Sequence, residues 1–124
     1  MVSRVSSARV SSAYYAVSTI DDRSRLADRS PLRILHWAPG LPITLLVLPG
    51  AIVVAAQPGG RETVTGHGHL RLPAGLRHAL KLKPGDTLLV AAHPDRGLLV
   101  AYTMSTLDAM VAAYHTSLTA RTSS

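Results

Sequence analysis

The two halves of the 124-residue chain carry the same signals in the same order. Each half has a Leu-Arg pair, then a Pro-Gly pair, then two short apolar runs joined by a turn. The offset between the halves is 44 residues from Arg33 to Arg77 and 45 residues from Pro39 to Pro84. Self-similarity at a nearly fixed offset indicates that one supersecondary unit is used twice.

These signals predict the same elements in each copy. Ser30 is expected to cap a short helix with Pro31 in its first turn, and Pro-Gly turns bound the hairpin. The elements predicted in the first copy are strands and a helix over residues 15–20, 25–27, 31–36, 41–48 and 51–56. Those predicted in the second copy lie over residues 62–65, 69–72, 74–80 and 86–102. Because isolated hairpins are only marginally stable, the two copies are expected to pack into one mostly β, pseudo-twofold barrel with short helices.

The repeat divides the chain into five parts. They are a flexible basic tail over residues 1–13, a first half-barrel over 14–57, a linker over 58–61, a second half-barrel over 62–104 and a C-terminal helix over 105–120.

Hydrophobic residues make up 47% of the chain, which excludes intrinsic disorder despite a net charge of +6. The absence of Cys excludes disulfides and thiolate zinc sites.

An uncharged stretch over residues 37–60 is long enough to cross a bilayer. Proline and glycine interrupt it repeatedly, and its second-half counterpart contains Asp86, Asp95 and Arg96, which suit a bilayer-spanning segment poorly. The N-terminal stretch shows no apolar core of a secretory signal. We therefore expect no membrane partner and a cytoplasmic location.

Two segments of the second half carry a family pattern. Residues 69–77 read HLRLPAGLR, and residues 80–86 read LKLKPGD. This pattern resembles the AbrB/MazE/SpoVT swapped-hairpin domain, and residues 21–40 match it more loosely. Together the two matches cover residues 15–102, most of the chain.

The resemblance implies a swapped-hairpin barrel, formed here by two internal repeats, and a nucleoid-associated DNA-binding transcription regulator. The turn-following arginine of the family falls on Arg25 and His69, and the helix arginine on Arg33 and Arg77. The residues that the resemblance and the charge pattern place against duplex DNA are Arg23, Arg25, Arg29, Arg33, His69, Arg71, Arg77 and Lys81. The alternative is an antitoxin or adaptor of a toxin–antitoxin-like pair whose main partner is a protein. Neither implies a cofactor.

The formal charge favours the second copy as the stronger electrostatic surface. Residues 61–104 contribute +3, whereas residues 15–60 contribute +1. Residues 66–68 are expected to form a turn. His67 and His69 are two residues apart, so on a strand both would point to one side, and they have too few further ligands for a metal site. Asp21 and the aspartate that follows it are expected to form a turn rather than a catalytic pair. The sequence offers no catalytic constellation, so we do not expect an enzyme.

The C-terminal helix is predicted from apolar residues at helical spacing. These residues are Leu107, Met110, Val111, Tyr114 and Leu118. Ser105 followed by Asp108 resembles a capping box at the start of the helix. The apolar stripe must be covered by the barrel or by another chain, and a second chain would be either another copy in a homodimer or a different protein.

Overall fold

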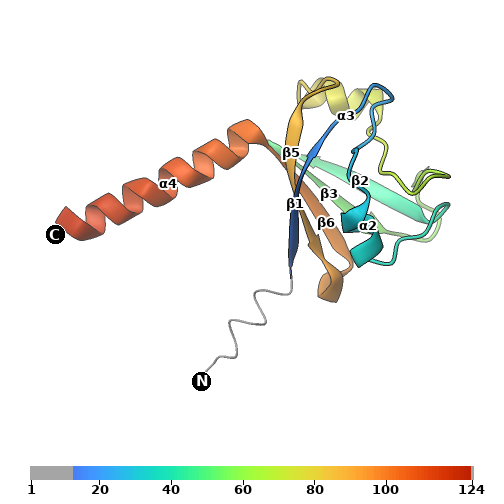
Figure 1. The fold of residues 1–124 in the computed structure, drawn as a ribbon, viewed down its shortest axis with the longest axis horizontal. Helices are drawn as coiled ribbons and strands as arrows, with labels where there is room; N and C mark the ends of the chain where they lie inside the picture. Colours follow the sequence, from blue (N-terminus) through green and yellow to red (C-terminus); the bar gives the residue numbers. More distant parts are fainter. Residues whose placement is uncertain (1–12, 124) are drawn as a thin grey trace.

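The computed structural model describes residues 13–123, which form a β-sheet domain with a long C-terminal helix (Figure 1). Apart from residue 13, the tail predicted over residues 1–13 lies outside the described residues. The elements of the first copy are β1 (Tyr14–Thr19), α2 (Ser30–Ile34), β2 (Pro42–Leu48) and β3 (Ala51–Ala56). Those that follow are β4 (Glu62–Thr63), α3 (Ala74–Ala79), β5 (Thr87–His93), a 3-10 turn η1 (Pro94–Arg96), β6 (Leu98–Thr103) and α4 (Met104–Ser123).

The six strands form one antiparallel sheet in the order β1-β5-β6-β3-β2-β4. This order is unchanged when the two copies are exchanged, and β6 and β3 lie at its centre. The first strand of each copy pairs with the hairpin of the other, β1 with β5 and β4 with β2. The predicted mostly β class is confirmed. The sheet is open, however, with β1 and β4 as its outermost strands.

The turn that follows the first strand is built alike in both copies. The amide of Asp21 donates to the carbonyl of Arg25 at 2.8 Å, and the amide of Thr65 donates to the carbonyl of His69 at 3.0 Å. The offset between these turns is 44 residues, as the sequence repeat predicts. Equivalent hydrogen bonds therefore accompany the equivalent sequence signals.

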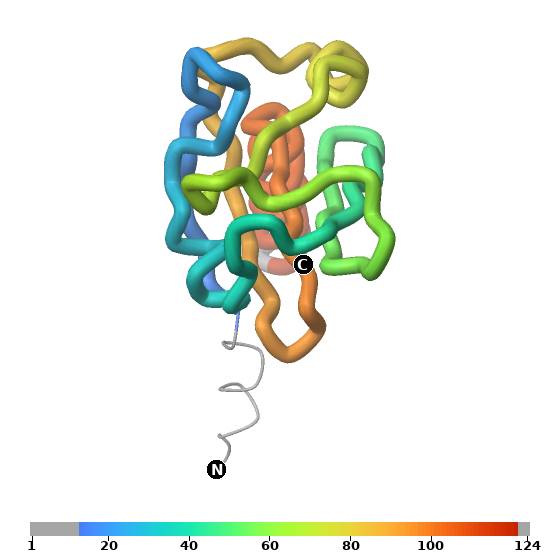
Figure 2. The backbone as a smooth tube through the Cα atoms, turned by 90° about the vertical axis from the view of Figure 1, so that its right-hand side faces the viewer, coloured from blue at the N-terminus to red at the C-terminus, as the bar shows by residue number. Residues whose placement is uncertain are grey.

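The segments after these turns form isolated bridges instead of the predicted return strands. Arg25 pairs with Arg71 in antiparallel fashion, and the amide of Leu26 donates to the carbonyl of Leu70 at 2.9 Å. These bonds join the two copies on the side of the sheet that carries the helices (Figure 2). Each segment is too short for a regular strand because its chain continues at once into α2 or α3.

Alternation along the strands separates two faces of the sheet. The inner face is covered by α2 and the bridging segments, and Trp37 is buried there with only 8% of its surface exposed. The largest fully buried core side chains are Ile20, Leu26, Leu32, Ile43, Ile52, Leu70, Leu72, Leu88 and Leu99. We call the opposite side the outer face; its residues are Tyr15, Val17, Thr19, Thr44, Leu46, Leu48, Ala51, Val53, Ala55, Thr87, Leu89, Ala91, His93, Leu98, Val100 and Tyr102.

The start of α2 differs from the prediction by one residue. Ser30 is the first helical residue and not the cap, which is Arg29. The carboxylate of Asp28 accepts the amide of Ser30 at 2.8 Å, and the Ser30 hydroxyl is 2.9 Å from the phenol oxygen of Tyr14. The serine thus ties α2 to β1, while the carboxylate two residues earlier satisfies the open amide. Pro31 lies in the first turn, as predicted.

The C-terminal helix α4 projects from the sheet on the side opposite α2 and α3 (Figures 1 and 2). The prediction that Ser105 caps this helix is wrong. Thr103 takes this role, because its hydroxyl accepts the amide of Thr106 at 3.2 Å. The helix is only weakly amphipathic, since alanines occupy its other sides, and Leu107 is half-buried at its base. The remaining predicted stripe residues are exposed rather than packed on the sheet: Met110, Val111, Tyr114 and Leu118.

Within residues 13–123, no helix combines the length and the apolar character that a membrane crossing requires.

Candidate nucleic-acid interface

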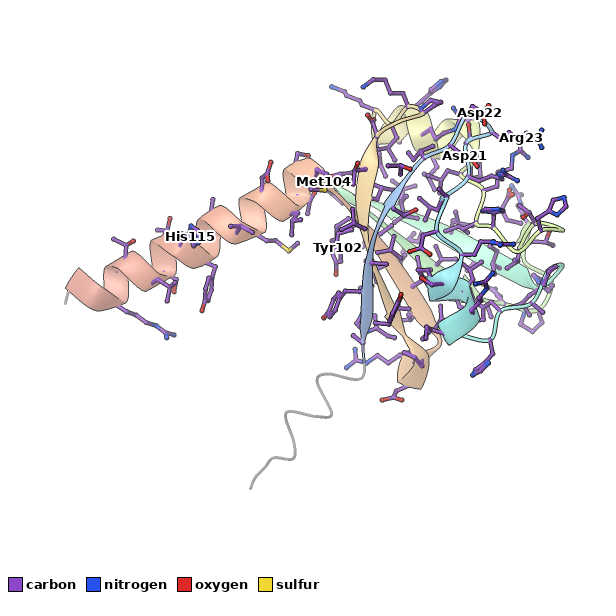
Figure 3. All side chains as sticks on the ribbon, in the orientation of Figure 1. Asp21, Asp22, Arg23, Tyr102, Met104 and His115 are labelled. Atoms are coloured by element: carbon purple, nitrogen blue, oxygen red, sulfur yellow. The ribbon has the colours of Figure 1, made fainter. Side chains whose placement is uncertain are left out.

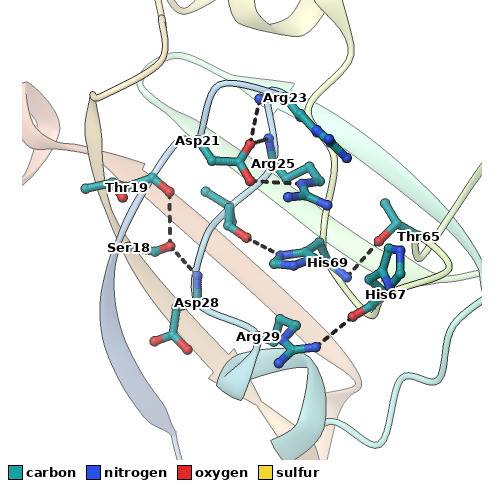
Figure 4. A network of polar contacts seen from close by, with 11 residues as sticks. Ser18, Thr19, Asp21, Arg23, Arg25, Asp28, Arg29, Thr65, His67 and His69 are labelled. Carbon is teal, nitrogen blue, oxygen red and sulfur yellow. Dashed lines mark hydrogen bonds and ion pairs between the residues drawn. The ribbon is translucent and has the colours of Figure 1, made fainter.

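The turn after β1 positions the first two cationic side chains of the candidate site. The carboxylate of Asp21 accepts the amides of Arg23 and Arg25, each at 2.9 Å, and its second oxygen accepts Nε of Arg25, also at 2.9 Å (Figure 4). Burial opposes ionisation of Asp21, but the hydrogen bonds from Arg25 and Arg23 outweigh it and lower the pKa of this carboxyl. The predicted turn is confirmed, and Arg25 enters the site as part of an ion pair.

The corresponding turn after β4 positions two histidines. The amide of His69 donates to the hydroxyl of Thr65 at 2.9 Å, and its ring Nδ1 lies 3.0 Å from the carbonyl oxygen of Leu26. His67 lies in the turn itself, and its carbonyl accepts Nη1 of Arg29 at 3.0 Å. The turn predicted over residues 66–68 is confirmed, and His67 lies within it, so the two histidines do not share a strand.

Two adjoining pockets lie on this side of the molecule. One has a volume of about 430 Å³ and lies beside α2; the other, of about 660 Å³, lies over the turn after β1. Arg29 and His67 line both pockets, so the two hollows adjoin at the hydrogen bond that joins these residues. We call them together the basic groove. Its basic and imidazole side chains are Arg23, Arg25, Arg29, Arg33, His36, His67 and His69.

The basic groove contains five of the eight predicted contact residues, and all four of its arginines come from the first copy. Arg71 is exposed beside Arg25 in the bridge between the copies. Arg77 donates its Nε to the carbonyl of Leu72 at 3.0 Å, which fixes its head group near α3. Lys81 lies in a different pocket, near the start of α4.

The second copy was expected to supply the stronger charge, but its structure gives a different distribution. Lys83 forms an ion pair with Asp86 at 3.2 Å. The hydrogen bonds from the backbone and side chain of Lys83 lower the pKa of Asp86, so this carboxylate is charged at neutral pH and offsets the lysine. The hollowed cationic surface belongs to the first copy, together with the histidine turn of the second.

His36 is a groove residue that the sequence predictions missed. It has a positive φ of 59°, and Lys81, which occupies the equivalent place 45 residues later, has a φ of 56°. Non-glycine residues rarely adopt this conformation, so the shared geometry marks a corresponding helix end in the two copies. Aligning the repeat through His36 and Lys81 would have identified this position as basic in both copies.

The arrangement suits an extended anion. Arginine guanidinium groups make paired hydrogen bonds to phosphate oxygens, and the backbone contacts of Arg29 hold its head group in a defined place. Asp22 also lines the groove, and Asp21 is engaged by Arg25, so the net positive charge comes mainly from Arg23, Arg29 and Arg33. Among the described residues, no group of three or more His, Cys, Asp or Glu side chains has the geometry to hold a metal ion.

Comparisons with protein-family models, with curated proteins and with solved structures found no match to this chain.

Proposed function

We propose that this protein is a DNA-binding transcription regulator of the AbrB-like type, associated with the nucleoid, and that the basic groove contacts duplex DNA. The observation that carries the proposal is the gathering of four arginines and three histidines around two adjoining hollows. These side chains come from segments about 40 residues apart, so the clustering is a product of the fold. A cationic groove of this kind suits the closely spaced phosphates of a duplex.

The topology gives a second line of support. In an AbrB-like swapped-hairpin barrel, two units exchange strands so that each completes the sheet of the other. In this chain, β1 pairs with the second copy's hairpin and β4 with the first copy's hairpin. The bridge between Arg25 and Arg71 and the hydrogen bond between Leu26 and Leu70 bring the two copies together opposite the sheet. On this proposal, the strands and the bridges together make the barrel, and its helix-bearing side carries the DNA contacts.

The proposed contacts divide by their surroundings. Arg23, Arg29 and Arg33 are exposed, so each can reach a phosphate without losing an internal partner other than the His67 carbonyl of Arg29. Arg25 and Arg77 are half-buried and hold internal hydrogen bonds, which suits the positioning of the turn and of α3 as well as contact with DNA. We assign the exposed arginines to phosphate contacts, which supply affinity without reading sequence.

Selection of bound duplexes from random DNA at physiological salt tests the proposal. The expected result is enrichment of a defined motif, with affinity that falls steeply as salt rises. The Arg29→Ala/Arg33→Ala double variant should lose most of this binding, because both arginines are exposed and line the groove. Arg61→Ala/Arg96→Ala is the matched control, because both of its arginines are exposed and line neither pocket of the groove. Binding that is unchanged in the first double variant would show that the assigned face is wrong.

A second candidate function is favoured by the exposure of α4. An antitoxin or adaptor would present this helix to a protein partner, and Met110, Val111 and Tyr114 are uncovered as that role requires. Replacing Met110 and Tyr114 by Lys separates the two functions. If the variant loses a co-purifying protein but keeps its DNA affinity, the adaptor is favoured. If the protein is a regulator that acts without such a partner, the wild type and the variant should purify with the same proteins.

A further inference from the structure

The outer face of the sheet is an uncovered apolar surface. It spans five strands, and none of its residues is Asp, Glu, Lys or Arg. Four of its side chains, Tyr15, Val17, Leu46 and Leu48, are between 41% and 63% exposed. A contiguous apolar surface of this extent on a small domain is typical of an interaction site rather than of a solvated face.

The second uncovered apolar surface is α4, which begins where β6 ends. Of the eleven large hydrophobic residues that are exposed in the described part of the chain, four lie on the outer face and five on α4. Figure 3 shows Tyr102 of the outer face just below Met104 at the start of the helix. The two surfaces therefore meet at an open angle, and both lack a cover.

The base of α4 is fixed by hydrogen bonds that hold it away from its own sheet. The hydroxyl of Thr106 donates to the carbonyl of Gly50 at 3.0 Å, and the amide of Thr103 donates to the same carbonyl at 3.1 Å. The Thr103 hydroxyl caps the helix. A Cβ at Gly50 would collide with the Thr106 side chain, and its φ of 76° also suits only glycine. Folding α4 back onto its own sheet would break these bonds, which favours a second chain as the cover of each surface.

The dimensions suit a second copy. A 20-residue helix is about 30 Å long. A strand of six residues spans about 20 Å, and five strands spaced about 4.8 Å apart cover a similar width. One helix therefore crosses the whole outer face. Two such helix-on-sheet contacts, related by a twofold axis, suit the roughly 1,200–2,000 Å² that a stable interface buries, whereas one contact or a helix pair alone would leave the sheet exposed.

We propose that the protein forms a twofold dimer in which α4 of each copy packs across the outer face of the other. The contact carries little formal charge on either side: the charged residues of α4 are limited to Asp108 and Arg121, and the outer face has none. The helix-bearing side with the basic groove points away from this interface in both copies. The dimer does not depend on the DNA-binding proposal, since it rests on the apolar surfaces alone.

Cysteine cross-linking of the full chain tests this arrangement, because the natural sequence contains no Cys. Tyr114→Cys is mixed in equal amounts with Val17→Cys and treated with a short bis-maleimide. The expected product is a cross-link between the two variants at twice the chain mass of 13.1 kDa. Ile34→Cys is the matched control, because Ile34 is 38% exposed but lies on α2, on the opposite side of the sheet. It should give no product with Tyr114→Cys.

Sedimentation of the unmodified chain and of two charge variants completes the test. The wild type should sediment as a dimer, and Val17→Lys and Tyr114→Lys should each become monomeric while keeping a cooperative thermal transition. The proposal is overturned if the wild type is monomeric at about 100 μM, a concentration far above typical dissociation constants of stable dimers. It is also overturned if Tyr114→Cys cross-links only to itself, or if Val17→Lys leaves the dimer intact, since either result means that the helices pair with each other.

Discussion

The two faces of the sheet differ in what they present to the surroundings. The inner face carries the core, and the helices and turns over it carry the arginines and histidines of the basic groove. The outer face has no formally charged residue and no helix packed along it. The same alternating strands build both, so a single strand pattern supports a core on one side and an uncovered apolar surface on the other. On the two proposals made above, the basic groove serves an anionic partner and the outer face serves an apolar partner.

The largest expected effect comes from comparing the loss of a core residue with the loss of an outer-face residue on the same strand. Leu99 is fully buried on the inner side of β6, whereas its neighbour Leu98 belongs to the outer face. Leu99→Ala should lower the free energy of unfolding by about 2–5 kcal/mol through lost burial and the cavity left behind. Leu98→Ala should lower it by less than about 1 kcal/mol in the monomer. Urea unfolding at low protein concentration measures both. Equal losses would mean that the outer face is packed as tightly as the core.

A smaller effect is expected on the slope of DNA affinity against salt. Arg29→Ala/Arg33→Ala removes two exposed arginines of the basic groove and should reduce the slope of log K against log salt by about 2. Arg61→Ala/Arg96→Ala removes the same charge from outside the groove and is the matched control, measured by fluorescence anisotropy. A slope that falls equally in both double variants would assign the salt dependence to net charge rather than to the groove.

The smallest effect concerns the turn that shapes the groove. The pKa of Asp21 is lowered in the folded protein, so its ionised form stabilises the fold above about pH 4, and this contribution is lost as pH falls through the folded pKa. Asp21→Asn should lower the free energy of unfolding by about 1 kcal/mol at pH 7. The variant should also lose less stability than the wild type between pH 5 and pH 2. Asp95→Asn, on the exposed turn η1, is the control. If the Asp21 variant loses stability with falling pH as the wild type does, the stabilising role assigned to ionised Asp21 is wrong.

Much of the fold could be predicted because its signals are local. The turns at Pro49-Gly50 and Pro84-Gly85 set the hairpin positions to within a residue or two, and the repeat offset predicted equivalent hydrogen bonds in both copies. The caps were mispredicted because partners far along the chain decide them. Ser30 is drawn to Tyr14, and α4 is tied to Gly50 through Thr106. No spacing rule reports such contacts.

The candidate site was predictable in its composition but not in its shape. The predicted contact residues Arg25, Arg29 and Arg33 all line the basic groove, whereas formal charge pointed to the second copy. Net charge by segment ignores where each side chain lies, such as Lys81, which lines a different pocket near the start of α4. It also ignores that the groove needs the histidine turn of the other copy. The outer face was not among the predicted surfaces.

Backbone amide chemical-shift mapping during titration with the selected duplex is the most direct test of the central claim, because it reports both faces at once. The account predicts that the largest changes fall on residues 21–36 and 66–71, around the basic groove, and that β3 and β6 change little. Changes concentrated on β3, β6 and α4, with the groove unaffected, would contradict it.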